Sequence, residues 1–301
     1  MIRRFQSPLV AFFILPALGV YALFVLWPFL NTFALSFMRW DGFADPKWIG
    51  AANYYERADS GDLGGLARDD VFRRALINNV IYWLITLVSE VAVGLGLAAL
   101  LVRVRYGRGF YRLALTSPLM IALVASAVLW RQILADRGVL NSSLQYLGLG
   151  TWARNWIEPS RVVYTVSFIS GWAYAGFYML IFYAGLERIP SELREAALID
   201  GASQWGIFRR VELPLLRPVI AVAVLLCSTG AFRAFDLFYV IVGTARTSTA
   251  EVASTWLVKN AFTFKRFGYA SAIAVVVVIV VMGLALLLSR WVAREKELEE
   301  F

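Results

Sequence analysis

Six long apolar runs dominate the sequence and restrict the folds that the chain can form. A helix that crosses a bilayer needs about 20 mainly apolar residues, because each residue adds only about 1.5 Å to its length. Hydrophobic residues make up 60% of the chain, which is more than one water-soluble core requires. The sequence therefore predicts an all-α, polytopic membrane protein with one transmembrane domain over residues 1–301. Its predicted spans cover about residues 9–37, 76–102, 111–134, 162–186, 215–243 and 269–292.

The first apolar run follows two basic residues, as the apolar core of a secretory signal peptide does. It is too long for such a core, contains Pro16 and Pro28, and is not followed by a convincing cleavage site. We therefore expect this run to be retained as a first span with a possible kink at a proline.

Basic residues in short loops predict the orientation in the membrane, since such loops stay in the cytoplasm. Arg3 and Arg4 precede the first span, and residues 103–112 contain four arginines and no acidic residue. An even number of spans returns the C-terminus to the side of the N-terminus. We expect both termini, and the polar segment 187–214, to lie in the cytoplasm.

The net charge of +8 does not indicate a nucleic-acid-binding protein, because the basic residues are scattered among loops instead of sharing one face. The chain has no histidine and one cysteine, Cys227, so an internal disulfide and the commonest metal ligand are both absent. It has no G-x-S-x-G motif and no G-x-x-x-x-G-K-[ST] phosphate loop. We expect no enzymatic activity, no nucleotide site and no cofactor in this chain.

The polar segment 187–214 reads ERIPSELREAALIDGASQWGIFRRVELP and predicts two short helices. Pro190 and Ser191 are typical of a helix start, and Gly201 suits the left-handed residue that follows a helix. Ser203 is a suitable cap for a second helix, which we expect to end before Pro214. Small residues surrounded by charged ones would let this segment enter a cleft of a partner protein. The alternative is a solvated amphipathic loop that only connects two spans.

The run EAALIDGASQWGIFRRVELPLLRP resembles the EAA motif of permease subunits in bacterial binding-protein-dependent ABC importers. The resemblance implies that its first helix docks on an ATPase subunit in the cytoplasm, and that ATP and Mg²⁺ bind to that partner. It also implies two ATPase copies, a second homologous permease, an extracytoplasmic solute-binding protein and a bacterial inner membrane. The residues to which the motif assigns the coupling role are Glu195, Ala196, Ala197, Asp200, Gly201 and Ala202.

A second stretch, GWAYAGFYMLIFYAGLERIP, resembles the sugar branch of that family through Trp172, Gly176, Phe177, Leu186 and Pro190. The resemblance implies import of a sugar or oligosaccharide by alternating access. The alternative cargo is glycerol 3-phosphate or another polyol phosphate. Many family members have a Gly-Gly-Gly-Pro turn after the fifth span, whereas this chain reads GTAR at residues 243–246, so the resemblance does not extend to that loop.

Polar residues inside the spans are candidates for the solute pathway, because they are costly in hydrocarbon. Glu90 has Gly94 and Ala98 nearby, so we expect it to pair with a neighbouring helix more than to bind solute. Arg233 and Asp236 are three residues apart and could form a pair on one helical face, or line the pathway.

A sugar is bound by hydrogen bonds to its hydroxyls and by aromatic rings against its C–H faces. Spans four and five contain both kinds of group. The family resemblance places the pathway near Ser170, Tyr174, Phe177, Cys227 and Gly230.

The segment between the first two spans, residues 39–74, is rich in Gly, Asp and aromatic residues. We expect an irregular external loop with one short helix at about Asn53–Ala58. It is either a landing surface for an external partner or a spacer with interfacial tryptophans.

Overall fold

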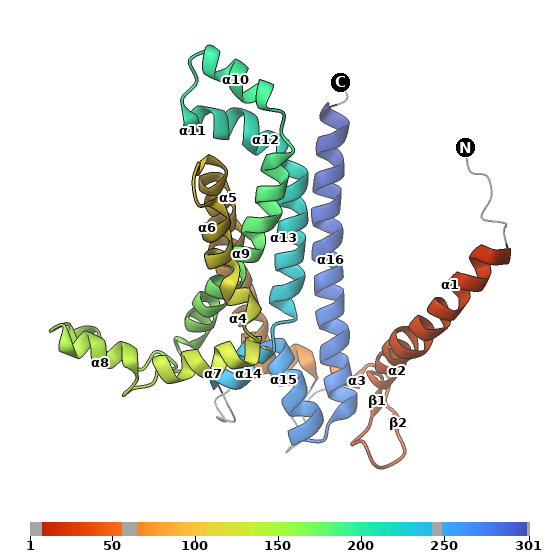
Figure 1. Cartoon of the computed structure of the whole chain (residues 1–301). Coiled ribbons are helices and arrows are strands. Elements are labelled where there is room, and N and C mark those ends of the chain that lie inside the picture. The colour runs from red at the N-terminus through yellow and green to blue at the C-terminus, as the bar shows by residue number, and fades with distance from the viewer. Residues whose placement is uncertain (1–7, 56–64, 243–248, 300–301) are drawn as a thin grey trace. The chain divides into compact units, whose positions relative to one another are not determined.

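A computed structural model describes residues 8–55, 65–242 and 249–299, and these residues are predominantly helical (Figure 1). They form two compact units, which are described separately. The first unit consists of Met1–Asp70 with Leu257–Val278, and the second of Val71–Trp256 with Ile279–Phe301.

The elements of the first unit are two helices joined by a π-helical turn, a small hairpin and short helices; η denotes a π or 3₁₀ segment. They are α1 (Pro8–Tyr21), η1 (Ala22–Leu26), α2 (Trp27–Leu35), β1 (Met38–Arg39), β2 (Lys47–Trp48), α3 (Ala52–Tyr55), η2 (Leu66–Arg68) and η7 (Lys259–Thr263).

The second unit contains the longer helices and the segments that connect them. Its elements are α4 (Asp70–Thr86), η3 (Leu87–Ala92), α5 (Val93–Arg103), α6 (Arg108–Thr116), η4 (Ser117–Met120), α7 (Leu123–Ile133), α8 (Val139–Tyr146), η5 (Gly150–Trp152), α9 (Val162–Glu187), α10 (Ser191–Ile199), α11 (Gln204–Ile207), η6 (Phe208–Glu212), α12 (Leu213–Leu215), α13 (Arg217–Phe232) and α14 (Asp236–Val242). The helices α15 (Ala253–Val258) and α16 (Phe267–Glu299) have residues in both units.

The hairpin of the first unit has two antiparallel strands, β1 and β2. The Asp41 carboxylate accepts hydrogen bonds from the backbone N–H groups of Phe43 and Ala44, which lower its pKa. Asn53 donates to the backbone oxygens of Ser36 and Met38, 2.8 and 3.0 Å away. The predicted helix at Asn53–Ala58 is α3, and Ala58 lies outside the described residues.

In the part of the chain that the structure describes, five helical segments are long and apolar enough to cross a membrane. They are Ile14–Leu35, Asp70–Arg103, Val162–Glu187, Arg217–Val242 and Phe267–Arg290, and they correspond to predicted spans one, two, four, five and six.

The predicted third span, residues 111–134, is not one straight helix. The segments Arg108–Met120 and Leu123–Ile133 meet at 91°, so the sixth crossing exists only if this broken pair makes it together. Pro118 has no backbone N–H, and the chain narrows to a 3₁₀ turn there before Ile121 and Ala122 become extended. The apolar composition continues through the break, so it did not reveal the change in direction.

Helix α9 is the most internal of these segments, and small residues let other backbones approach it. A Cβ atom added to Gly94 of α5 would lie 2.8 Å from the Cβ of Tyr178 and 2.9 Å from the backbone nitrogen of Met179. On α9 itself, a Cβ at Gly176 would lie 2.2 Å from the carbonyl oxygen of Leu115. Glycine at these positions therefore allows close helix packing.

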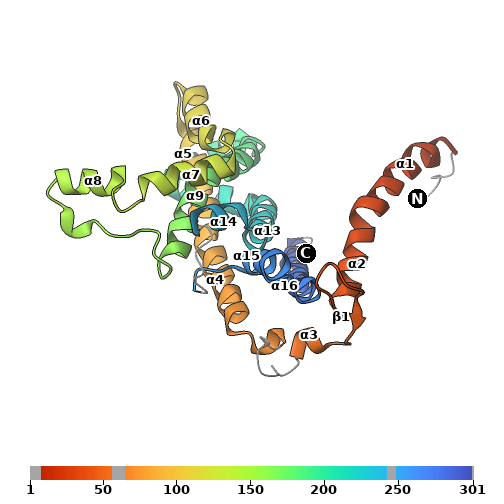
Figure 2. The same cartoon turned by 90° about the horizontal axis from the view of Figure 1, so that it is seen from below.

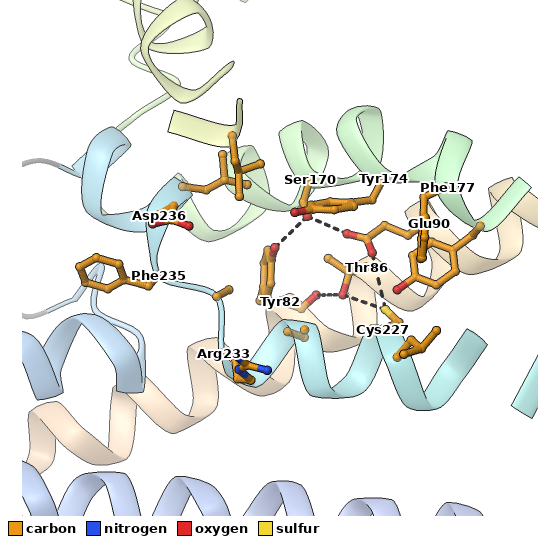
Figure 3. A pocket seen from close by; sticks show the side chains of 17 residues that line it. Tyr82, Thr86, Glu90, Ser170, Tyr174, Phe177, Cys227, Arg233, Phe235 and Asp236 are labelled. Carbon is orange, nitrogen blue, oxygen red and sulfur yellow. Dashed lines mark hydrogen bonds between the residues drawn. The ribbon is translucent and has the colours of Figure 1, made fainter. Parts of the chain in front are cut away.

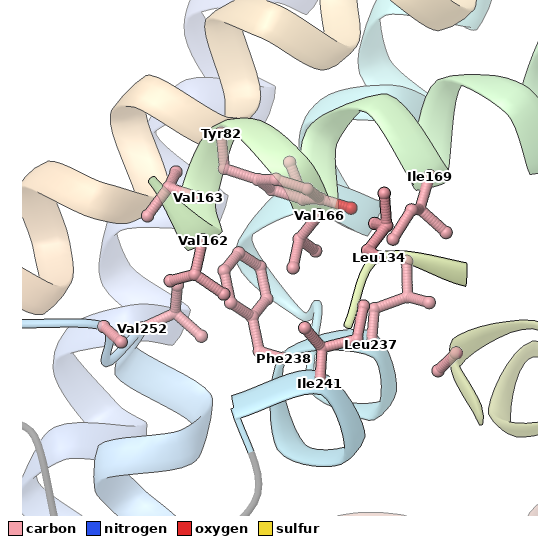
Figure 4. Close-up of a cluster of buried hydrophobic side chains, with 13 residues drawn as sticks. Tyr82, Leu134, Val162, Val163, Val166, Ile169, Leu237, Phe238, Ile241 and Val252 are labelled. Carbon is pink, nitrogen blue, oxygen red and sulfur yellow. The ribbon is translucent and has the colours of Figure 1, made fainter. Parts of the chain in front are cut away.

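A buried apolar cluster holds α14 against α9 and α4 (Figure 4). Phe238 of α14 is fully buried, and its ring meets that of Tyr82 edge to face at 5.1 Å. Leu237 and Ile241 of the same helix pack with Val166 and Ile169 of α9. This cluster keeps α14 folded against the end of α9 after the chain leaves α13.

The connecting segments of the second unit lie at opposite ends of α9 and α13. Helices α10, α11 and α12 lie at one end, and α7, α8 and α14 lie at the other (Figure 1). Seen along the perpendicular direction, α7 lies beside α14, and α8 extends away from α13 and α14 (Figure 2). Asn141 organises the α8 arm, because its amide oxygen accepts from Trp156 Nε1 at 2.9 Å and from the backbone of Arg154.

Replacement of Gly94 by valine tests the packing of α5 on α9. Gly94→Val should lower the free energy of unfolding by about 1–3 kcal/mol, because the new side chain meets backbone that cannot move aside cheaply. Gly96→Val is the matched control, since a Cβ there has no neighbour within 4 Å. Thermal unfolding of the detergent-solubilised protein measures both variants, and equal losses would contradict the packing argument.

Candidate solute cavity and coupling helix

A cavity of about 340 Å³ lies within the second unit, between α4 with η3, α9, α13 and the turn into α14 (Figure 3). Its volume is at the small end of the range for small-molecule sites, about 300–1,000 Å³. One end is formed by buried side chains, among them Tyr82, Glu90 and Cys227, whereas Arg233 and Asp236 at the other end are exposed.

All five residues predicted for the solute pathway line this one cavity: Ser170, Tyr174, Phe177, Cys227 and Gly230. Ser170 and Cys227 are buried, Tyr174 and Phe177 are half-buried, and Gly230 is exposed. Two neighbouring segments of the chain therefore bring these residues together, and their role in binding stays a prediction.

A chain of hydrogen bonds crosses the buried end of the cavity (Figure 3). Tyr82 Oη donates to Ser170 Oγ at 2.8 Å, and Ser170 Oγ donates to Glu90 Oε1 at 2.6 Å. The Cys227 thiol lies 3.8 Å from Glu90 Oε2 and 3.7 Å from Thr86 Oγ1. A buried carboxylate needs such donors, because it has lost its hydration.

Glu90 therefore pairs with a neighbouring helix, as predicted, and also lines the cavity. It lies in the π-helical segment η3, a type of local widening that is frequent at functional sites. Tyr82 and Thr86 were not predicted to line the cavity. Their spacing could have indicated it, because Tyr82, Thr86 and Glu90 follow one another at intervals of four residues and therefore share one helical face.

The predicted Arg233–Asp236 pair does not form in this structure. Helix α13 ends at Phe232 and α14 begins at Asp236, so the two residues do not share one helical face. No ion pair within 4.0 Å joins them, although both belong to the described part of the chain and both line the cavity. The helix breaks because α14 is held against α9 by its buried apolar side chains.

The cavity offers hydroxyl groups, carboxylates, one guanidinium and aromatic rings, a set that suits a hydroxyl-rich organic solute. Within residues 8–55, 65–242 and 249–299, no three metal-ligating side chains converge.

The predicted coupling helix is α10, and the chain turns sharply after it. Gly201 has a φ of +79°, a left-handed conformation that favours glycine. The backbone N–H of Gly201 donates to Leu198 O at 3.0 Å, and that of Ala202 donates to Ala197 O at 2.9 Å. These two bonds form a Schellman motif, which satisfies carbonyls at the helix end.

The ends of the two short helices agree with the sequence only in part. Pro190 occupies the N-cap of α10, and no side chain caps it, whereas Ser203 caps α11 by accepting from Gly206 N at 3.1 Å. The second helix, α11, ends at Ile207, before Pro214 as predicted, but the helical run continues through the π-helical segment η6 and the short helix α12 to Leu215. Pro214 lies in the first turn of α12, where a missing backbone N–H is tolerated.

The outer face of α10 is open, and it carries both acidic and apolar side chains. Glu195, Asp200 and Gly201 are exposed, and Ile199 is 87% exposed. Leu193 and Leu198 of the same helix are also exposed, at 45% and 49%, and several exposed apolar side chains on one short helix are typical of a surface that a partner covers. Among the other predicted coupling residues Ala196 is exposed, and Ala197 and Ala202 are half-buried.

The family model described as "Binding-protein-dependent transport system inner membrane component" matches residues 63–296 of this chain. The chain is 37% identical over 290 residues to a probable ABC transporter permease protein, YurN, of Bacillus subtilis, covering 95% of this chain and 96% of the relative. It is 31% identical to the trehalose/maltose transport system permease protein MalF of Thermococcus litoralis, over 87% of this chain and 86% of that protein.

The fold also matches a solved structure. A chain in the crystal structure of a bacterial ABC transporter involved in the import of the acidic polysaccharide alginate superimposes with a TM-score of 0.81. The alignment covers 95% of both chains at 23% sequence identity, so it supports the fold alone.

The hydrogen bonds of Ser170 predict a stability loss in Ser170→Ala. The variant should lose about 1–2 kcal/mol, because Tyr82 and Glu90 both lose their shared partner inside the protein. Ser167→Ala is the control on the same helix, since the Ser167 hydroxyl is equally buried but donates only to Val163 O, one turn away. Thermal unfolding in detergent compares the two, and a larger loss in Ser167→Ala would refute the prediction.

Proposed function

Because the chain belongs to the family of binding-protein-dependent transport system inner membrane components, the permease subunits of ABC importers, we propose that it imports a sugar or oligosaccharide by alternating access. The observation that carries this proposal is the cavity, in which Ser170, Tyr174 and Phe177 of α9 face Cys227 and Gly230 of α13. Relatives whose names specify trehalose and maltose or starch degradation products support the same class of cargo.

The hydrogen-bonding groups of the cavity fit a neutral solute. Glu90 and Asp236 contribute two carboxylates, and Arg233 contributes one guanidinium. Hydroxyls of a sugar can donate to the carboxylates, and the rings of Tyr174 and Phe177 can contact its C–H faces. A polyol phosphate, the alternative cargo, would bring two negative charges toward an excess of acidic groups, which disfavours it.

The chain supplies the path and takes its energy from other subunits. In this proposal α10 docks on an ATPase subunit through its exposed face, with Glu195, Asp200 and Gly201 at the contact and Ile199 covered by it. Two ATPase copies bind ATP and Mg²⁺, and a second homologous permease completes the translocation pathway. An extracytoplasmic solute-binding protein delivers the sugar to the outer side.

Alternating access then follows from two states of one assembly. With the outer side open, the cavity receives the sugar through the end at which Arg233 and Asp236 lie. Closure of the ATPase dimer displaces α10, and the helices that flank the cavity rearrange toward the inner side. This assignment gives the orientation of the chain in the membrane, because α10 and the α7–α8 segments lie at opposite ends of α9 (Figure 1).

Stimulation of ATP hydrolysis tests the cargo. The complex, purified with its ATPase and binding protein and reconstituted in nanodiscs, should hydrolyse ATP faster with a member of a panel of maltose, maltotriose, trehalose and raffinose. Glycerol 3-phosphate should have no effect, because its charge is repelled by the cavity. Stimulation by glycerol 3-phosphate with no response to any sugar would favour the alternative cargo.

Gly201→Trp tests the coupling. The bulky side chain disfavours the left-handed backbone at φ +79° and obstructs the exposed surface, so the ATPase should fail to co-purify and uptake should be lost. Arg210→Trp is the control, since Arg210 is also exposed in the same loop but lies outside the coupling residues. Normal uptake and normal ATPase attachment in Gly201→Trp would contradict docking through α10.

A further inference from the structure

The segment that follows α10 contains a buried carboxylate that neither the cavity nor the exposed face of α10 explains. Glu212 is the last residue of η6, and its side chain is only 2% exposed. Arg103 Nη2 lies 3.0 Å from Glu212 Oε2, and Arg194 Nε lies 2.9 Å from Glu212 Oε1. One carboxylate thus connects three segments that are far apart in the sequence.

Arg194 connects α10 to this carboxylate and to the end of α9. Its Nη2 donates to the backbone oxygen of Leu186, 2.7 Å away. Leu186 lies in the last turn of α9, where carbonyl groups carry partial negative charge, and its oxygen also accepts from the backbone N–H of Ile189 at 3.3 Å. The inner face of α10 is therefore anchored, whereas Ile199 on the same helix stays exposed.

Arg103 connects the same carboxylate to α5, of which it is the last residue. Its Nη1 donates to the backbone oxygen of Ala99 on α5, and its Nε lies 3.4 Å from Gln204 Oε1. The guanidinium also lies over the ring of Phe208, 5.9 Å from its centroid. Arginine suits this position, because its planar group can donate in several directions at once.

Glu212 balances the charge of its two arginine partners, so a substitution that removes its charge should be costly. Two arginines share this one buried carboxylate, with side chains that are 30% exposed at Arg103 and 25% exposed at Arg194, and the neighbouring acidic residues of α10, Glu192 and Glu195, are exposed. Removal of one member of a buried ionic group leaves the others with an unbalanced charge, which costs far more than an exposed pair contributes.

We infer that Glu212 is a positioning residue that joins α10, the end of α9 and the end of α5 into one unit, so that displacement of α10 moves the second span together with the fourth. This inference rests on the proposed docking of an ATPase on α10. Arg103 and Glu90 belong to the same continuous helical segment, Asp70–Arg103. Motion applied at Arg103 therefore reaches the wall of the cavity along one helix.

The ratio of ATP hydrolysed to sugar imported measures this link in the reconstituted complex, with the panel sugar that stimulates hydrolysis most as the probe. Glu212→Gln keeps the shape of the side chain and removes its charge. It should raise the ratio about tenfold or more, since two arginines lose their counter-charge. ATPase co-purification should stay normal, because the exposed face of α10 is unchanged. Arg103→Met should have the same effect, and Arg210→Met, an exposed control, should have none.

The double variant Arg103→Met/Glu212→Gln separates this link from general destabilisation. If the two residues act as one unit, the double variant is no worse than either single variant. The inference would be overturned by an unchanged ratio in Glu212→Gln or Arg103→Met, as proportional losses of hydrolysis and import would give. It would also be overturned if the effects of the two substitutions on the ratio added up in the double variant. Failure of the proposed function gives a different result, because the unaltered chain would then not retain an ATPase at all.

Discussion

The close approach of α5 to α9 at Gly94 determines where the polar groups of the cavity can meet. Since Gly94 has no side chain, the backbones come close enough for η3, four residues earlier, to place Glu90 opposite Ser170. A carboxylate between two membrane helices is costly unless it is hydrogen-bonded, so a donor on the neighbouring helix stabilises it. One glycine therefore decides both how tightly two spans pack and whether an acidic side chain can be kept between them.

Glu90 and Arg103, two polar residues of the segment Asp70–Arg103, have different surroundings. Glu90 is surrounded by neutral hydroxyl and thiol groups near a cavity, whereas Arg103 meets a fully buried carboxylate beside the short helices. Only apolar and small side chains separate them along α5. Such a helix is stiff, because all its backbone hydrogen bonds are internal, and it keeps the distance between its two polar ends constant.

Local chemistry explains what the sequence predicted well. The bend after α10 follows from Gly201 and Ser203, whose preferences act over a few residues, and the cavity residues followed from a family resemblance that covers both flanking spans. Apolar runs located the spans but not the direction of the backbone, so the 91° break after Pro118 was missed. The break at Arg233 depends on Phe238 packing against Tyr82. The partner of Glu212 at Arg103 lies 109 residues away, and no periodicity indicates it.

Two close backbone contacts hold α9 at nearly the same level along its axis. Gly94 brings α5 against residues 178–179, and Gly176 brings the carbonyl of Leu115 against another side of the helix. Contacts this close, near the centre of the helix, resist sliding of α9 along its own axis, because a shift would bring a residue with a Cβ atom opposite the carbonyl of Leu115 in place of Gly176.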